Sequence, residues 1–151
     1  MAVGSFSASH GRYLGVDYGD VRTGLAVSDV GGMLAGALGL VKAGGMRGMA
    51  HEVAEAAKRE GVVRIVIGLP KNMDGSEGFR AEAVRAFAEL LATETDIPLD
   101  FMDERLSTCE AHRYLTDTGT NGRRRKNVVD ALSAQIILQD YLDREKNSTK
   151  I

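Results

Sequence analysis

Three carboxylates in otherwise apolar segments are the side chains of this sequence best suited to chemistry. Asp17 ends an apolar run before a glycine-containing turn, Glu104 ends a second such run, and Asp130 stands near the start of an apolar, helix-like segment. Carboxylate oxygens are the preferred ligands of hard cations such as Mg²⁺ and Mn²⁺. Three acids around one point can hold two such ions about 3.5–4 Å apart, which activate water and stabilise the leaving oxygen in phosphodiester hydrolysis.

Each acid taken singly also has a structural explanation. Asp17 could only shape its turn, Glu104 could be a solvated strand end, and Asp130 could pair with one of Arg123–Arg125. Asp103 is a secondary candidate, but neighbouring residues on a strand point to opposite faces, so only one of Asp103 and Glu104 is expected to face the ions. The occurrence of all three acids at strand ends or a helix start favours a shared site.

Zinc and thiol chemistry fit the sequence less well. His10, His51 and His112 share no spacing typical of zinc ligands. Cys109 is the one cysteine, so it has no partner for an internal disulfide, which suits a reducing cytoplasm.

Composition indicates one globular domain over residues 1–151, with flexible tails at 1–11 and 146–151. Apolar residues make up 44% of the 151 and charged residues 26%, which are ordinary globular values. The net charge of −2 argues against a purely electrostatic nucleic-acid binder but allows a local basic patch. No apolar run reaches the roughly 18 residues of a membrane span, and the first residues do not resemble a signal peptide, so a cytoplasmic location is expected.

The periodicity of apolar residues predicts a mixed sheet flanked by helices. Strands are expected at Tyr13–Asp17, Leu25–Ser28, Leu38–Val41 (an edge strand), Val62–Gly68 (buried and parallel) and Pro98–Asp103, and helices from Met46 to a stop at Gly61, from Phe79 to Thr95, from a capping box at Ser107–Glu110, and from Val128 to Arg144 with Asn127 as N-cap. This order is typical of the α/β class.

The last of these helices places an acid on an apolar face. Asp130, Ala134, Ile137 and Tyr141 recur at helical spacing, so they share one side of the helix. A carboxylate on a core-facing stripe must be paired or metal-bound, or its pKa must rise.

Several polar residues near the acids could contact a nucleic-acid backbone. Arg22 and Thr23 belong to the turn facing the first acid, where they could reach a phosphate, although Arg22 could instead pair with Asp20. Arg105 follows Glu104 directly and could orient it or bind substrate.

Two loops add further candidates. Asn72 follows the strand that ends in Gly68-Leu69-Pro70 and could touch substrate, or it could only shape the loop together with Asp74 and Ser76. The glycine-containing segment Thr116–Lys126 is expected to be a mobile substrate clamp, the alternative being a solvated loop. Its basic residues are Arg123, Arg124, Arg125 and Lys126. Aromatic residues make up only 5% of the chain, so backbone contacts are expected to dominate over base stacking.

Four motifs in combination resemble the YqgF/RuvX family over roughly Arg12 to Leu142. They are Gly15-Val16-Asp17-Tyr18-Gly19 with Arg22-Thr23-Gly24 and Ala26-Val27-Ser28-Asp29; Ile67-Gly68-Leu69-Pro70 with Asn72-Met73-Asp74-Gly75-Ser76; Asp103-Glu104-Arg105-Leu106-Ser107-Thr108; and Asp130-Ala131-Leu132-Ser133-Ala134-Gln135. The resemblance implies a ribonuclease H-like fold and a nuclease with Asp17, Glu104 and Asp130 as catalytic, metal-binding acids for Mg²⁺ or Mn²⁺. Lys71 departs from the small or apolar residue expected at its position.

The resemblance further implies processing of the 5′ end of pre-16S rRNA in ribosome biogenesis, with Holliday junction resolution in DNA repair as the alternative. A non-catalytic RNA-binding module is a third possibility, which converging like charges speak against. One half of a sugar-kinase or actin-like ATPase is a fourth, but that fold needs two such domains. The choice between Mg²⁺ and Mn²⁺, and between a monomer and a homodimer, stays open.

Overall fold

The computed structural model describes residues 11–104 and 122–149, with side chains described for 11–104 and 130–146. The strands are β1 (Arg12–Asp17), β2 (Arg22–Ser28), β3 (Ala35–Lys42), β4 (Val62–Leu69) and β5 (Leu99–Asp103), and the helices are α2 (Met46–Glu60), α3 (Phe79–Glu94) and α5 (Gly122–Thr149). The predicted helix after the capping box at Ser107–Glu110 lies outside the described residues. None of the described helices is long and apolar enough to cross a membrane.

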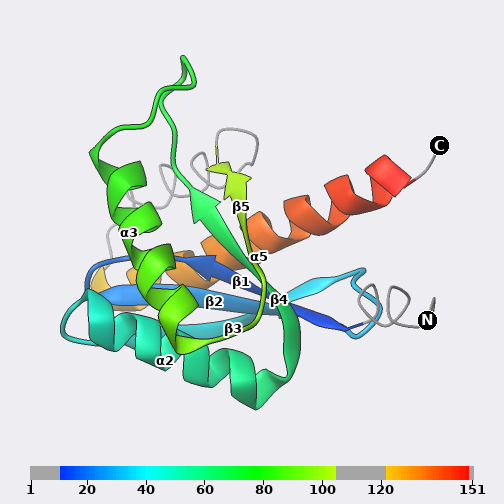
Figure 1. Cartoon of the computed structure of the whole chain (residues 1–151), viewed down its shortest axis with the longest axis horizontal. Helices are drawn as coiled ribbons and strands as arrows, with labels where there is room; N and C mark the ends of the chain where they lie inside the picture. The colour runs from blue at the N-terminus through cyan, green and yellow to red at the C-terminus, as the bar shows by residue number, and fades with distance from the viewer. Residues whose placement is uncertain (1–10, 105–121, 150–151) are drawn as a thin grey trace.

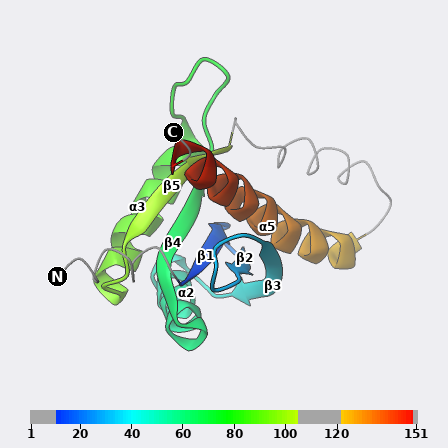
Figure 2. The same ribbon diagram turned by 90° about the vertical axis from the view of Figure 1, so that its right-hand side faces the viewer.

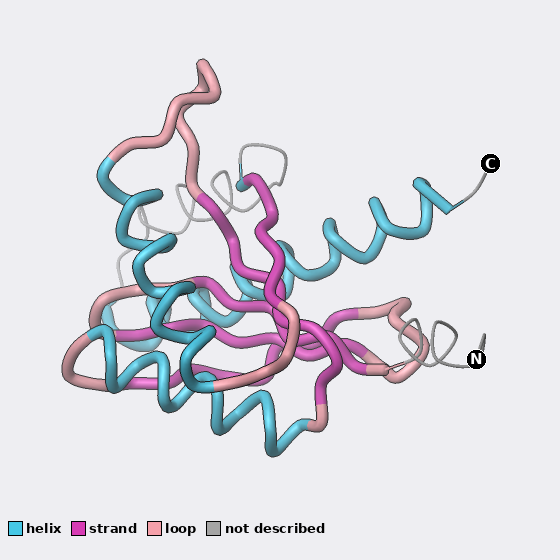
Figure 3. Tube along the Cα trace, in the orientation of Figure 1, coloured by secondary structure: helices cyan, strands magenta, loops and turns pink. Residues whose placement is uncertain are grey.

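The five strands form one mixed sheet in the order β3-β2-β1-β4-β5 (Figures 1 and 3). The first three strands are antiparallel neighbours, whereas β4 runs parallel to both β1 and β5. This arrangement confirms the predicted mixed sheet, the edge position of β3 and the buried parallel strand β4. Because β1, β4 and β5 are parallel, their carboxyl ends meet at the same edge of the sheet.

Helices cover both faces of the sheet, as Figure 2 shows with the strands between α5 and the pair α2–α3. One core lies beneath α2 and α3 and includes Leu14, Val16 and Phe87. The second lies beneath α5 and includes Leu138 and Val66. Successive residues of a strand point to opposite faces, which is why β1 contributes to both cores.

Three glycines let α5 lie close to the sheet. A Cβ on Gly15 would lie 2.7 Å from the Leu138 Cβ, and one on Gly68 would lie 2.6 Å from Ile137 Cδ1. A Cβ on Gly24 would collide with the backbone carbonyl oxygen of Asp130. Gly15, Gly24 and Gly68 lie on adjacent strands, so together they leave a flat sheet surface, free of side chains at these positions, on which the helix packs.

The amphipathic helix α2 follows its sequence pattern closely. Met49, Ala50 and Val53 on its apolar face are fully buried. The helix stops at Gly61, whose φ of 63° is the left-handed conformation that glycine adopts without a steric penalty. The predicted stop at Gly61 is therefore confirmed.

The bounds of α5 differ from the sequence prediction at both ends. The helix begins at Gly122, so Asn127 lies inside it and is not its N-cap. It continues to Thr149, which carries it beyond the expected end at Arg144 and into the segment predicted to be a tail. Arginine and lysine are good helix formers, so a basic run can extend a helix as readily as it can form a loop.

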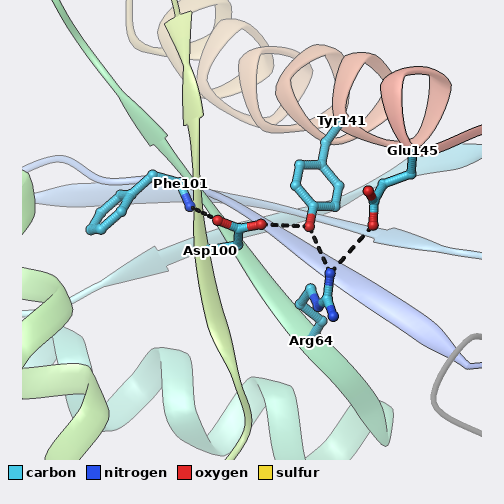
Figure 4. Close-up of polar contacts among 5 residues, drawn as sticks. All are labelled: Arg64, Asp100, Phe101, Tyr141 and Glu145. Carbon is cyan, nitrogen blue, oxygen red and sulfur yellow. Dashed lines mark hydrogen bonds and ion pairs between the residues drawn. The ribbon is translucent and has the colours of Figure 1, made fainter. Parts of the chain in front are cut away.

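A polar cluster ties α5 to β4 and β5 (Figure 4). Tyr141 donates a hydrogen bond to Asp100 at 2.7 Å and accepts one from Arg64 at 2.8 Å. Arg64 also contacts Glu145 at 3.3 Å and lies over the ring of Tyr13, 5.6 Å from its centroid. Burial and the hydrogen bond to Asp100 raise the pKa of the Tyr141 hydroxyl, so it stays protonated and able to donate. The cluster fastens the second half of α5 and thereby helps set the position of its first half.

Candidate active site

Asp17 is the last residue of β1 and stands at the carboxyl end of the parallel strands. It is paired in register with Gly24 of β2, and a Cβ added to that glycine would point toward α5. Directly paired residues of antiparallel strands point to the same face, so the Asp17 carboxylate is directed to the α5 side of the sheet. Only 9% of the residue is exposed, which fits a functional acid at the edge of a core.

Glu104 follows β5 directly and is 3% exposed. Its carboxylate lies beside Gly68 of β4, because a Cβ on that glycine would sit 3.2 Å from Glu104 Oε1. Any larger residue at position 68 would therefore crowd the carboxylate. The predicted strand end at Gly68 thus contributes to the site by leaving room for an acid on the neighbouring strand.

Asp130 reaches the same end of the sheet from α5. Its side chain is 23% exposed, and its carboxylate lies 3.4 Å from Nε of Arg22, the first residue of β2. The sequence had offered Asp20 as a partner for Arg22 and one of Arg123–Arg125 as a partner for Asp130. This ion pair joins residues 108 positions apart (130 minus 22), which no local pattern indicates. The side chains of Arg123–Arg125 lie outside those that the structure describes.

Two adjacent hollows connect the three acids. The larger, of about 380 Å³ and here called the Glu104 hollow, is lined by Asp17, Tyr18, Gly19, Asp20, Met46, Gly68, Pro70, Phe79, Arg80, Ala83, Val84 and Glu104. The second, of about 320 Å³ and here called the Asp130 hollow, is lined by Asp17, Tyr18, Gly19, Asp20, Val21, Arg22, Arg80 and Asp130. Asp17 lines both hollows, whereas Glu104 and Asp130 each line one. The three acids thus lie along one edge of the sheet, with Asp17 between Glu104 and Asp130.

The donor set fits hard divalent cations, although the acids do not form one tight cluster. All three candidate ligands are carboxylates, which favour Mg²⁺ or Mn²⁺ over zinc. Within residues 11–104 and 130–146, no group of three histidine, cysteine, aspartate or glutamate side chains is close enough to hold a single ion. Asp17 and Glu104 face one hollow and Asp17 and Asp130 the other, which suits two ions sharing Asp17 better than one ion held by all three.

Two further candidates, Thr23 and Asn72, form hydrogen bonds within their own turn or loop. Thr23 is fully buried, and its hydroxyl hydrogen-bonds with Gly19 across the turn, so it shapes the turn and offers no surface to a substrate. Asn72 donates from its side chain to Ser76 at 2.9 Å, and Asp74 accepts from Ser76, which supports the loop-shaping alternative for all three. Neither Thr23 nor Asn72 lines a hollow.

The basic candidates lie partly outside the described residues, and Arg105 is one of these. Arg123–Lys126 belong to the first turns of α5, so the loop predicted over Thr116–Lys126 does not extend to these four residues. Asp103 lines neither hollow, whereas Glu104 lines one. This difference agrees with the expectation that only one of the two faces the site.

Sequence reasoning missed three residues that line the hollows. Arg80, in the first turn of α3, faces both hollows. Phe79 precedes it and lines the Glu104 hollow. Tyr18 stacks on Phe87 with ring centroids 4.4 Å apart, and burial together with Asp20 raises the pKa of its hydroxyl. A usable signal existed for Arg80, because it lies in the first turn of the helix that follows β4, and the carboxyl ends of parallel strands are where α/β sheets place their ligands.

Comparison with known proteins gives consistent relatives. A protein of Clostridioides difficile (strain 630) named "Putative pre-16S rRNA nuclease" is 44% identical over 138 residues, which is 91% of this chain and 98% of that protein. A protein of the same name from Moorella thermoacetica is 43% identical over 133 residues, covering 88% and 95% of the two chains. In each comparison, the similarity therefore extends over nearly the full length of both chains.

Solved structures share the architecture at lower identity. RuvC of T. thermophilus, in complex with a Holliday junction substrate, superimposes with a TM-score of 0.57 at 18% identity, covering 92% of this chain and 98% of that one. A second T. thermophilus RuvC structure gives a TM-score of 0.52 at 16% identity. The sheet and its helices thus have the RuvC-type, ribonuclease H-like fold. The family model described as "RuvX: Holliday junction resolvase" matches residues 11–144, and this chain therefore belongs to the RuvX family of nucleases.

Proposed function

We propose that this nuclease depends on divalent metal ions held by Asp17, Glu104 and Asp130. The observation that carries the proposal is the position of Asp17 on both hollows, with Glu104 on one and Asp130 on the other. The nearly buried Asp17 and Glu104 gain from a cation, because buried carboxylates need a compensating charge or hydrogen bonds. Mg²⁺ or Mn²⁺ at these acids supplies an activated water and stabilises the leaving oxygen.

The protein's own contribution is to position the carboxylates and to attract the phosphate of the substrate. Gly68 leaves room for the Glu104 carboxylate, and the pairing of Asp17 with Gly24 directs Asp17 toward α5. Arg22 and Arg80 stand at the rim of the Asp130 hollow, where guanidinium groups attract phosphate oxygens. Arg22 and Arg80 thus draw a phosphodiester toward the acids, which would otherwise repel it.

The proposed substrate is pre-16S rRNA, cut at its 5′ end during ribosome biogenesis in the cytoplasm. The names of relatives that are 43–44% identical over most of both chains support this choice. A four-way DNA junction is the second candidate, which the description of the family model favours. Both are structured nucleic acids, and both require the same phosphodiester chemistry at the acids.

The basic run Arg123–Lys126 is the proposed backbone contact, together with Arg105. Cations in the first turn of a helix face the positive end of its dipole, which costs stability. The first turn of α5 contains no acidic residue to offset them. A phosphate backbone would supply negative charge at this helix end, which supports substrate binding by these residues.

The test compares cleavage of a 5′-extended pre-16S rRNA fragment and of a four-way junction at matched metal and salt. We expect EDTA to stop cleavage, Mg²⁺ or Mn²⁺ to restore it, and the RNA to be cut faster. Asp17→Asn, Glu104→Gln and Asp130→Asn are each expected to lose cleavage. Asp17→Asn and Glu104→Gln should keep equal or higher thermal stability, because repulsion between like charges is relieved, whereas Asp130→Asn also loses the ion pair with Arg22.

Asp103→Asn is the matched control, because that aspartate neighbours Glu104 but lines neither hollow, and it should cleave normally. A purified Asp17→Asn variant that cleaves at the wild-type rate would refute the metal-site assignment. Faster cutting of the junction would reverse the order of the two substrates. Tight RNA binding without cleavage of either would instead favour a binding module.

A further inference from the structure

An exposed aromatic ring stands at the wall of the Glu104 hollow. Phe79 is the first residue of α3 and is 86% exposed, yet it lines the same hollow as Asp17 and Glu104. It belongs to neither hydrophobic core, so packing does not explain a phenylalanine there. A large apolar side chain left in solvent beside a functional site is a feature that binding explains better than folding.

The segment before Phe79 is braced, so the ring is presented from an ordered support. Loop 70–78 rises from the body of the molecule between β4 and α3 (Figure 1). Within it, the Asn72 amide donates to Ser76 at 2.9 Å, and the Ser76 hydroxyl donates to Asp74 at 2.6 Å. Glu77 receives two hydrogen bonds of 2.6 Å from Arg85 of α3. These contacts fix the end of the loop against the helix that begins at Phe79.

The hollow combines three kinds of surface. Its acidic part is formed by Asp17 and Glu104, and its apolar part includes Met46, Pro70 and Val84 beside the ring. Arg80, directly after Phe79, lines both this hollow and its neighbour. A phosphate alone would use the arginine and the metal-binding acids but would leave the apolar wall empty.

We propose that the Glu104 hollow is a nucleobase pocket, in which Phe79 stacks on the base of an unpaired nucleotide beside the phosphate that is cut. Arg80 contacts an adjoining phosphate. A nucleotide has a group for each surface of the hollow. Its base offers an apolar π-face to the apolar wall, and its phosphate offers negative charge to Arg80. This inference rests on the proposed nuclease function and deepens it, since it names the local state of the substrate at the cut.

Cleavage at an unpaired nucleotide follows from the geometry of stacking. A base inside a regular duplex already stacks on its neighbours and must leave the helix before it can reach a protein ring. The pocket therefore selects single-stranded or splayed nucleotides at the point of cleavage. The low aromatic content had suggested that stacking would be minor. One ring at the right position is enough to give a preference of about 5- to 150-fold, which is the range for stacking of one base on an aromatic side chain.

The first experiment measures binding in EDTA, so that it is independent of cleavage. The probes are a single-stranded RNA carrying 2-aminopurine at successive positions and the same RNA annealed into a duplex. We expect the wild type to quench the fluorescence at one or two positions and to prefer the single strand. Phe79→Ala should lose the quenching and bind the single strand about 5- to 150-fold more weakly. Phe79→Tyr should restore both.

Leu34→Ala is the matched control. Leu34 is 70% exposed and lies between β2 and β3, at the end of the sheet opposite Asp17, so its loss should change neither quenching nor affinity. A second measurement places an abasic nucleotide at the quenched position. The abasic RNA should weaken wild-type binding by the same factor as Phe79→Ala, and it should weaken binding by Phe79→Ala no further.

Two outcomes separate this inference from the proposed function. In one outcome, Phe79→Ala cleaves at the wild-type rate, and both proteins bind the single strand and the duplex equally well. That result would overturn the base pocket and leave the proposed nuclease intact. Position-specific quenching that depends on Phe79, in a protein that cleaves nothing with Mg²⁺ or Mn²⁺, would support the base pocket and refute the metal-dependent nuclease. Loss of quenching in Leu34→Ala to the same extent as in Phe79→Ala would also overturn the pocket.

Discussion

Nε of Arg22 lies 3.4 Å from the Asp130 carboxylate, which joins the start of β2 to α5 across the Asp130 hollow. The guanidinium occupies one side of a carboxylate that is also a proposed metal ligand. In the proposed site Arg22 would have two opposing roles, because it would attract phosphate and would compete with a cation for Asp130. The separation of these roles can be measured.

Arg22→Gln should lower the Mg²⁺ concentration needed for half-maximal cleavage, because a competing positive charge is removed. The same change should weaken substrate binding and lower the slope of log affinity against log salt by about 0.7–0.9, the value for one phosphate that the protein no longer neutralises. A metal titration of cleavage and a salt series of binding check the two effects. Arg12→Gln is the control, since Arg12 pairs with Glu60 at the other end of β1. An unchanged or higher Mg²⁺ requirement in Arg22→Gln would contradict the competition.

Gly24→Ala should destabilise the protein and reduce cleavage together. The added Cβ collides with the backbone carbonyl oxygen of Asp130, so β2 and α5 must separate where the acid is held. The expected loss is about 1–3 kcal/mol in the free energy of unfolding, as for other overpacked sites. Urea unfolding measures it. Gly36→Ala on β3 is the control, because nothing lies within 4 Å of its added Cβ, and it should leave stability and cleavage unchanged.

Tyr141→Phe should cost about 1–2 kcal/mol of unfolding free energy at neutral pH, because the hydroxyl bonds to both Asp100 and Arg64. Burial and Asp100 raise the pKa of Tyr141, so the folded protein holds this proton more tightly than the unfolded chain. The contribution is full below the unfolded pKa of about 10 and falls as pH rises above it. The stability difference between wild type and variant should therefore shrink from pH 9 upward in denaturant titrations. A difference that grows with pH would show the opposite sign.

Replacing Arg123, Arg124, Arg125 and Lys126 with glutamine should weaken binding to all sequences alike. Glutamine keeps a helix propensity close to that of arginine and lysine, so α5 should still form. The salt slope of binding should fall by about 0.7–0.9 for each phosphate that these side chains no longer neutralise, while cleavage at saturating substrate should fall less than affinity. Lys58→Gln with Arg59→Gln, at the exposed end of α2, is the control. An unaltered slope in the quadruple variant would identify the run as a solvated one.

The elements that position the acids could be predicted because their signals are local. The glycine after α2, the β-branched run of β4 and the helical spacing from Asp130 to Tyr141 each report on backbone conformation within a few residues. The start of α5 could not, since a run of basic residues after a glycine fits a loop and a helix equally well. Helix propensity is a weak signal, and arginine and lysine are good helix formers, so the local pattern could not place this helix start.

The partners of the site could not be predicted for a different reason. The pairing of Arg22 with Asp130, and the position of Phe79 on the same hollow as Glu104, depend on how distant elements meet at one edge of the sheet. The sequence indicated which residues could do chemistry but not which of them would touch. Thr23 illustrates the limit, because it was expected in the turn, whereas it lies in β2 and its hydroxyl is turned inward to Gly19.

The placement of α5 over the second face has a consequence for the order in which the protein becomes functional. Asp17 ends the first strand and Glu104 directly follows the fifth, but Asp130 and the cover of the second core come only with α5. Chains fold from the N-terminus as they are synthesised, so the first core can form while the second face is still bare. On the proposed assignment, the catalytic centre is complete only once α5 has docked on the sheet, so a chain whose first core has already folded would still be inactive until that step.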